Sequence, residues 1–422
     1  MTTAQIIAIV IFLVTMTAIM TEKLHRTVAA IAGALLLVLT GVLSVEKGFS
    51  YVDANTLGVL VGMMLFVSVV KHSGLFEYIA LRAAKLAKGR PWPLMLLLAL
   101  LTALLSAFLD NVTTVLLIGP MTLAITGRLK LNPVPFFLSQ IMAANIGGTA
   151  TLIGDPPNIM IGSAAGLSFL DFAANTGVAV VFVLAAVLVC FYFLYGRKLR
   201  VSQEDIQEVL ALEERETIQD LPLLRKSVGM IVLVVVGFVF HAQLHLASST
   251  VALTAAAVML LIGRRNVEEI VAGVEWTTIL FFLGLFVVVG GLQETGVIQL
   301  LANGLMDLTQ GNRLMMMLMI LWGSAILSAF LDNIPFVATL IPLILTMEQG
   351  GMDVAPLWWA VSLGACLGGN GTLIGASANV VLSGISGRHG HPISFWRYFK
   401  VGFPLMLLSM VICTVFLLVR FG

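Results

Sequence analysis

One stretch of the sequence occurs twice and divides the chain into two related halves. The letters SAFLDN at 106–111 return at 328–333, and TLIGDPPN at 151–158 returns as TLIGASAN at 372–379. Asp110 and Asp332 are 222 positions apart (332 minus 110), and Gly62 and Gly284 keep the same spacing. Because this period is about half of the 422-residue chain, it indicates a duplicated half-protein rather than a solenoid of short repeats.

The chain is too apolar for a protein whose whole surface faces water. Hydrophobic residues make up 59% of it and charged residues 11%, whereas soluble domains carry about 25% charged residues. Apolar runs such as 6–20, 28–42, 177–195 and 402–418 approach the roughly 20 residues that cross a bilayer as a helix. We therefore expect an all-α integral membrane protein, multi-pass, in the cell's inner (plasma) membrane.

Charge and cysteine content narrow the set of partners. A formal net charge of +1 predicts no nucleic-acid partner, and three cysteines in apolar stretches predict neither a disulfide framework nor a metal–thiolate site. The expected partners are the lipid bilayer and a small inorganic or organic solute. No cofactor and no metal site are expected.

The basic loops predict the topology, because Lys and Arg concentrate on the cytoplasmic side. Loops 82–90, 128–130, 197–226, 264–265 and 388–400 can all be cytoplasmic only if 92–127 and 314–347 turn back within the membrane. This gives about ten transmembrane helices plus two re-entrant hairpins, with equivalent spans running in opposite directions. Inverted repeats of this kind are common in secondary transporters.

The predicted organisation is as follows. Residues 1–196 form the first inverted repeat, with hairpin 92–127 and a broken helix at 134–165. Residues 227–422 form the second, with hairpin 314–347 and a broken helix at 355–383. The polar segment 197–226 is a cytoplasmic linker, and a solvated linker is favoured over a second domain.

Three aspartates lie where the chain should be inside the membrane. Asp110 and Asp332 fall at the predicted hairpin tips, and Asp155 lies between glycine and two prolines. Charged groups at such depth are costly and mark functional sites. Glycine and proline free backbone groups that must line protein or a cavity, where carbonyls can bind cations.

The repeat separates Asp155 from the other two aspartates. Its counterpart is Ala376, which favours a single proton carrier over an architectural residue needed in both copies. For Asp110 and Asp332, a structural alternative is that each carboxylate accepts hydrogen bonds from backbone amides at its hairpin tip.

Matched asparagines, threonines and glycines complete one predicted central site. The paired asparagines could instead bridge broken helix ends, and Cys366 is favoured as apolar packing over a thiol contact to the solute. The candidate substrate- and ion-binding residues are Asp110, Asn111, Thr113, Thr114, Asn145, Gly148, Thr151, Gly154, Asp155, Asn158, Asp332, Asn333, Asn370, Thr372, Gly375, Ser377 and Asn379.

These motifs resemble those of the ion-transporter superfamily, within it the arsenite-permease/sodium–proton-antiporter group, and most closely its P-protein-like members. The resemblance covers nearly the whole chain. It implies a scaffold domain and a transport domain, usually a homodimer, and elevator-type alternating access. Dicarboxylate and citrate relatives carry Ser-Asn-Thr at the hairpin tips, where this chain resembles them with Asp110-Asn111 and Asp332-Asn333. The added negative charge disfavours an anionic substrate.

The leading functional hypothesis is a proton-coupled arsenite/antimonite efflux antiporter, with a cytoplasmic ATPase partner if it exports arsenite. The alternatives are a sodium–proton antiporter, with Na⁺ replacing H⁺ as coupling ion, and a sodium-coupled di/tricarboxylate or other anion transporter. A channel or an intramembrane aspartyl protease is disfavoured. The protease motif Gly-x-Gly-Asp fails because Leu152 stands two positions before Gly154, so an enzyme is not expected.

Overall fold

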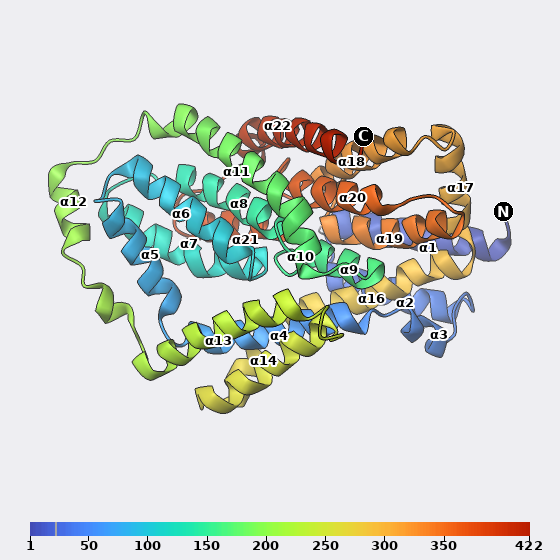
Figure 1. The fold of residues 1–422 in the computed structure, drawn as a ribbon, viewed down its shortest axis with the longest axis horizontal. Helices are drawn as coiled ribbons and strands as arrows, with labels where there is room; N and C mark the ends of the chain where they lie inside the picture. Colours follow the sequence, from blue (N-terminus) through green and yellow to red (C-terminus); the bar gives the residue numbers. More distant parts are fainter. Residues whose placement is uncertain (22) are drawn as a thin grey trace.

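The structure, a computed structural model, describes residues 1–21 and 23–422, and it contains no strand within those ranges. Figure 1 shows the helices as they follow one another along the chain. The elements of the first half are α1 (Thr3–Thr21), α2 (Arg26–Leu39), α3 (Val45–Ser50), α4 (Ala54–Lys71), α5 (Leu75–Leu86), α6 (Pro91–Ser106), α7 (Asn111–Arg128), α8 (Val134–Thr149), α9 (Pro156–Ala165), α10 (Phe169–Phe172), η1 (Ala173–Gly177), α11 (Val178–Phe191) and η2 (Tyr192–Gly196).

The second half repeats this order of elements after a short connecting segment. That segment holds α12 (Gln203–Leu210) and η3 (Glu214–Thr217). The remaining helices are α13 (Leu221–Phe240), α14 (Ser248–Gly263), α15 (Val267–Ala272), α16 (Trp276–Glu294), α17 (Val297–Thr309), α18 (Arg313–Phe330), α19 (Asn333–Gln349), α20 (Ala355–Gly368), α21 (Ser377–Arg388) and α22 (Phe395–Phe421).

The helices confirm the predicted all-α membrane fold. Seven stretches among the described residues are long and apolar enough to cross a bilayer: α1, α4, the continuous stretch Phe169–Gly196, α13, α16, α18 and α22. Shorter apolar helices of 10–17 residues, including α2, α6, α14 and α19, account for further predicted spans and for parts of the two predicted hairpins. Whether each hairpin turns back inside the membrane stays a prediction.

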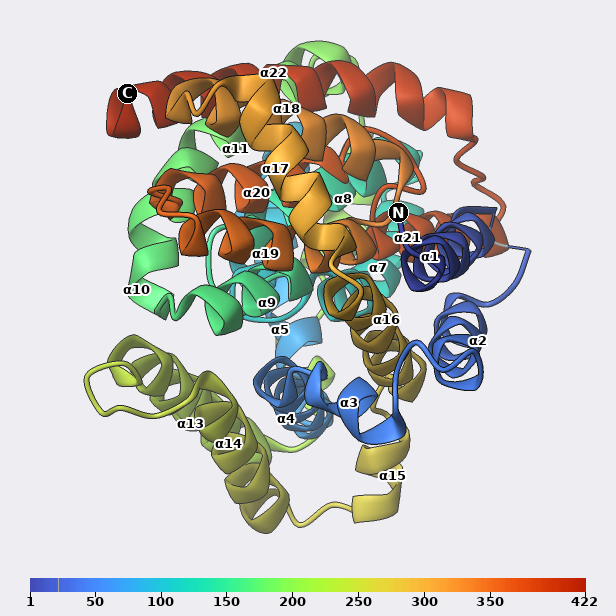
Figure 2. The same ribbon diagram turned by 90° about the vertical axis from the view of Figure 1, so that its right-hand side faces the viewer.

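Four helices, two from each half, form an interlocked scaffold. Helix α2 packs along α16 and helix α14 packs along α4, so each half supplies one helix to each pair. Figure 2 shows these helices below the remainder of the molecule, with α13 and α15 beside them. Glycines allow the close approach: a Cβ added to Gly62 would lie 2.6 Å from the carbonyl carbon of Ala252, and one on Gly284 would lie 2.7 Å from that of Ala30.

The central body lies against this scaffold and consists of α6–α9 and α18–α21. Helix α6 packs on α8, and α18 packs on α20 in the same way. In Figure 1, α6 and α7 lie toward the linker helix α12, whereas α18 and α19 lie toward the N-terminus. The two Asp-Asn tips therefore approach the middle of the molecule from opposite ends.

Both halves interrupt a helix at the repeated motif. Helix α8 ends at Thr149 and α9 begins at Pro156, while α20 ends at Gly368 and α21 begins at Ser377. Proline suits the first position of a helix, because it lacks the N–H that would be unpaired there. The six or more residues between the two helices leave backbone groups that need other partners.

The connecting segment is attached to the first half. Glu214 forms ion pairs with Arg82 (2.7 Å) and Lys85 on α5, and Asp205 pairs with Lys130 at 2.6 Å. The backbone N–H of Gln219 donates to Ser73 O at 3.2 Å. Helix α13 begins at Leu221, inside the segment predicted as linker. The segment is thus docked rather than free.

The interlocked scaffold predicts a sharp difference between two glycines. In Gly284→Ala the new Cβ would collide with the backbone of α2, and overpacking of this kind costs about 1–3 kcal/mol. In Gly323→Ala the Cβ has nothing within 4 Å, and alanine favours a helix by up to about 1 kcal/mol. Thermal unfolding in detergent should give a lower Tm for Gly284→Ala only; equal Tm values would contradict the close packing.

The linker contacts predict a pH-insensitive attachment. The Lys85 ammonium, with the backbone amide of Glu214 and then Arg82, lowers the pKa of Glu214 to about 2. Since the pKa is lowered, the attachment is complete above the ordinary glutamate range and is lost only as pH falls toward that value. Limited proteolysis of the linker should therefore be equal at pH 7 and pH 5. It should be faster at both in Glu214→Gln, but not in the exposed control Glu216→Gln.

Candidate functional site

The two hairpin tips and the first helix break enclose one small central cavity. It has a volume of ≈ 20 Å³, which is room for about one water-sized species. The central body contributes both tips and the start of α9, and the scaffold contributes side chains from α2, α4 and the start of α16. The lining includes Arg26, Leu60, Met64, Asp110, Asn111, Asp155, Glu275, Thr278, Asn333 and Ser377.

Asp155 is the most buried carboxylate of this site. Its residue is 1% exposed, and its Oδ2 has no hydrogen-bond partner among the described residues. The side chain faces the thiol of Cys366 and the amide of Asn333. Ala376 occupies the equivalent position with nearly the same backbone (φ −143°, ψ 134° against φ −150°, ψ 147°). The backbone therefore does not need this carboxylate.

Asp110 and Asp332 both cap the helix that follows their hairpin tip. Asp110 accepts from Thr113 N (2.8 Å) and from Thr113 Oγ1 (2.5 Å). Asp332 Oδ1 accepts from Ile334 N at 3.1 Å. Both aspartates therefore accept hydrogen bonds from backbone amides at their hairpin tips, as the structural alternative expects. Thr113 contacts Asp110 and does not line the cavity itself. Asp332 keeps its second oxygen for another partner.

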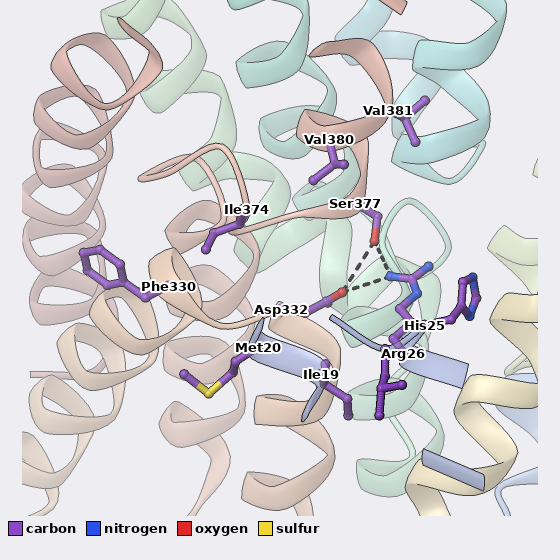
Figure 3. A pocket seen from close by; sticks show the side chains of 11 residues that line it. Ile19, Met20, His25, Arg26, Phe330, Asp332, Ile374, Ser377, Val380 and Val381 are labelled. Carbon is purple, nitrogen blue, oxygen red and sulfur yellow. Dashed lines mark hydrogen bonds and ion pairs between the residues drawn. The ribbon is translucent and has the colours of Figure 1, made fainter. Parts of the chain in front are cut away.

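That partner is Arg26, the first residue of α2, which the sequence analysis did not single out. Arg26 Nη1 lies 3.0 Å from Asp332 Oδ2 and donates to Ser377 Oγ at 2.6 Å. Its Nη2 donates to Thr278 Oγ1 at 3.3 Å, and its guanidinium lies over the ring of Phe281. Figure 3 shows Arg26 reaching between Asp332 and Ser377. In the sequence, Arg26 looks like an ordinary charged residue of a loop, next to His25. The one sequence feature that could have drawn attention to it is that the equivalent residue of the second half, Ser248, is neutral.

Four asparagines from both halves form a connected network. Asn111 Nδ2 donates to Asn145 Oδ1 at 3.2 Å. Asn145 Nδ2 in turn donates to Asn370 Oδ1 (3.0 Å) and to Asn379 Oδ1 (2.8 Å). All four side chains are buried. The network joins the first hairpin tip to the second helix break.

Asn158 and Asn379 tie the broken helices together. Asn158 Nδ2 donates to Thr149 O (3.1 Å) and Thr151 O (2.9 Å), and Asn379 Nδ2 donates to the carbonyls of Gly369 (2.8 Å) and Thr372 (2.9 Å). These amide nitrogens are used within the protein. The bridging alternative thus accounts for this pair, and only their Oδ1 atoms face other side chains.

The remaining predicted residues hold each break against its hairpin. Thr151 Oγ1 donates to Ala107 O, and Thr372 Oγ1 donates to Ala329 O. Glycine allows the chain segments on the two sides of each break to touch. A Cβ on Gly148 would lie 2.6 Å from Gly154 O. A Cβ on Gly375 would lie 2.7 Å from Gly369 O.

Several buried polar atoms near the site have no hydrogen-bond partner in the part of the chain that the structure describes. They are Asp155 Oδ2, Asn333 Nδ2, Thr114 Oγ1 and Asn370 Nδ2. Buried polar groups are nearly always paired, so a group of exceptions at one place indicates a binding site. Cys366 lies beside it, with its Sγ 3.6 Å from Asn158 Oδ1.

Two larger cavities separate the scaffold from the central body on either side of the site. One, of ≈ 410 Å³, contains Ser68, Lys71, Thr113 and Glu269 in its lining. The other, of ≈ 320 Å³, contains Asp53, Ser163, Gly290 and Gln293. Ser68 and Lys71 are equivalent to Gly290 and Gln293 at the 222 spacing, so the two cavities are repeat-related.

Comparisons with known proteins agree with this architecture. A family model described as "Citrate transporter" (CitMHS) matches residues 16–364. Two proteins of Mycobacterium tuberculosis described as uncharacterized transporters are each 42% identical over 99% of both chains. The P protein of Homo sapiens is 34% identical over 94% of this chain, which spans 58% of that protein. The crystal structure of the Alcanivorax borkumensis YdaH transporter matches with a TM-score of 0.56 at 15% identity, over 100% of this chain and 99% of the other, which shows a shared fold.

The roles assigned to Asn158 and Asn379 predict a loss of stability. Asn158→Ala leaves the buried carbonyls of Thr149 and Thr151 without a donor, and each such group costs about 1–3 kcal/mol. Asn379→Ala leaves that of Gly369, since Thr372 O still accepts from Gly375 N at 3.3 Å. Both variants should unfold at lower temperature than the wild type in detergent. The exposed control Asn303→Ala should not, and an unchanged Tm for Asn158→Ala would remove the bridging role.

Proposed function

The chain belongs to the citrate transporter family of the ion-transporter superfamily. We propose that it is a proton-coupled secondary antiporter. It is a multi-pass membrane transporter, in keeping with a Mycobacterium leprae relative, 39% identical, that is described as a 46 kDa membrane protein. Proton coupling, substrate and mechanism are the proposed part.

The observation that carries the proposal is the buried carboxylate of Asp155. Because its Oδ2 has no hydrogen-bond partner among the described residues, its charged form is costly, and a bound proton or cation would stabilise it. Asp155 lies at a cavity with room for about one water-sized species. We therefore assign it the role of proton carrier, with Na⁺ as the alternative ion.

The charges of the site favour a neutral or cationic solute. The carboxylates of Asp110, Asp155 and Glu275 line the cavity together with the guanidinium of Arg26, and a fourth carboxylate, that of Asp332, pairs with this guanidinium. Excess negative charge repels a tricarboxylate such as the citrate in the family's description. A neutral arsenic or antimony trihydroxide, or Na⁺, meets this requirement. Arsenite/antimonite efflux is our leading substrate proposal, and sodium–proton exchange is the second.

The contacts between scaffold and central body support an elevator-type movement, because they differ between the two halves. On one side, Asn55 Nδ2 donates to Ser163 Oγ on α9 at 3.2 Å and to Ser248 Oγ at 3.1 Å. On the other side Arg26, the equivalent of Ser248, donates to Ser377 Oγ at the start of α21. The scaffold groups that hold the central body thus differ between the two sides, because Asn55 is equivalent to Thr277 and not to Arg26.

The two contact points also lie at different places along the helix that follows each break. The residue equivalent to Ser377 is Pro156 (377 minus 221), whereas the scaffold contact on α9 is at Ser163. Seven residues of α-helix (163 minus 156) rise by about 10 Å. We propose that exchanging the contacts of the two halves moves the central body along the scaffold by a distance of this order. A homodimer, and an ATPase partner if arsenite is exported, complete the proposal.

The proton-carrier role predicts the behaviour of Asp155→Asn. The amide cannot release a proton, so pH-driven transport in proteoliposomes should fall to background while the protein elutes and melts like the wild type. The exposed control Asp307→Asn should transport normally. Normal pH-driven flux in Asp155→Asn would remove it as the carrier.

The charge argument predicts the substrate class. Proteoliposomes with an imposed pH gradient and an internal pH-sensitive dye would receive arsenite, Na⁺ or citrate separately. We expect dissipation of the gradient with arsenite, or with Na⁺ if the second proposal holds, and none with citrate. Dissipation with citrate alone would overturn the proposed selection against anions.

A further inference from the structure

We propose that Arg26 is a tethered counter-ion, which neutralises Asp332 in the position of the two bodies seen here and must leave it when the central body moves. The inference rests on the proposed function, because it assumes that movement. Arg26 is then a positioning residue that links the charge of the site to the position of the central body.

The Arg26–Asp332 pair crosses the boundary between the two bodies. Arg26 belongs to scaffold helix α2, whereas Asp332 and Ser377 belong to the central body. The side chains of the ion pair are 27% and 14% exposed, so water screens the interaction only in part. Scaffold groups hold the guanidinium from the other side through Thr278 and Phe281.

The guanidinium also has room to withdraw. A cavity of ≈ 330 Å³ lies beside it and is lined mainly by apolar side chains, including Ile19, Met20 and Val380. Figure 3 shows Arg26 and Asp332 at one edge of this cavity, with His25 next to Arg26. Arg26 can therefore move away from Asp332 without rearrangement of a packed core.

The second half of the repeat has no such cation. The position equivalent to Arg26 is Ser248, and the residue equivalent to Asp332 is Asp110. Ser248 Oγ is bonded to Asn55, and Asp110 bonds Thr113. If the central body moved to the exchanged position, Asp110 would approach a neutral serine. A cationic side chain that neutralises a hairpin-tip aspartate is therefore present at one end of the movement only.

It follows that Arg26 and a small cation cannot occupy Asp332 at the same time. When Arg26 is withdrawn, the carboxylate is left beside other negative groups, and a proton or a monovalent cation has to replace the guanidinium. The charged and titratable groups that face this pair are Asp110, Asp155, Glu275 and His25. A small cation and Arg26 then alternate on Asp332, and return of Arg26 expels the cation.

The test measures the position of the central body by cross-linking. The pair Asn55→Cys/Ser163→Cys joins scaffold to α9 only in the position seen here, where the native side-chain atoms are 3.2 Å apart. It would be made with Cys190→Ser, since Cys366 and Cys413 are buried. Yield with a short thiol cross-linker would be compared for Arg26, Arg26→Lys and Arg26→Gln, in NaCl against choline chloride and at pH 8 against pH 6.

We expect the Arg26 protein to cross-link well in choline at pH 8 and less in NaCl or at pH 6. Arg26→Gln should reduce the yield at least about threefold under all conditions, because truncation of one partner leaves the other charge unpaired. Arg26→Lys should restore much of it, because it keeps the positive charge beside Asp332. The control Gly237→Cys/Val251→Cys lies within α13 and α14, and its yield should be the same in every background.

Two results would overturn the inference in different ways. If Arg26→Gln cross-links like Arg26 while the yield still responds to cations, the bodies move but Arg26 does not hold them. If every variant cross-links completely under all conditions, the bodies do not move, and the proposed elevator mechanism fails together with the inference.

Discussion

The structure depends on satisfying the backbone groups that two interrupted helices release inside an apolar protein. Hydrocarbon offers these groups no partners, so each break has to carry its own. Asn158 and Asn379 donate to the carbonyls of their breaks, and Thr151 and Thr372 donate to the ends of the adjacent hairpins. With these bonds in place, side chains between the breaks are held rigidly enough to form a binding site. The small central cavity is their product.

Because these hydrogen bonds at the helix breaks are present in both halves, the differences between the halves indicate what is needed for function. Ala376 is the equivalent of Asp155 in the second half, and its backbone has nearly the same conformation. Ser248 is the equivalent of Arg26, and Cys366 is the equivalent of Asn145. None of these substitutions alters the fold, yet each changes charge or hydrogen bonding at the centre. A symmetric frame with asymmetric chemistry suits a carrier that must bind at one end and release at the other.

Much of this could be predicted from the sequence, and the remainder could not, for physical reasons. Composition and the repeated motif predict a membrane protein of two related halves, because both act through local properties of the chain. The aspartates of the site were predicted because charge next to helix breakers is rare in apolar sequence. Arg26 and Glu275 lie at helix starts and look like ordinary loop charges, and only the packing of α2 and α16 against the hairpin tips places them there. The roles of Asn158 and Asn379 likewise depend on which carbonyls lie within reach.

The interlocked scaffold has a consequence for how the protein is made. Helices α2 and α4 are synthesised early, but their packing partners α16 and α14 belong to the second half. The first half therefore enters the bilayer with two faces still uncovered, that of α2 at Ala30, which Gly284 later contacts, and that of α4 at Gly62. Helix α4 can find its partner only after the linker, α13 and α14 have been inserted, and α2 only after α16 has followed.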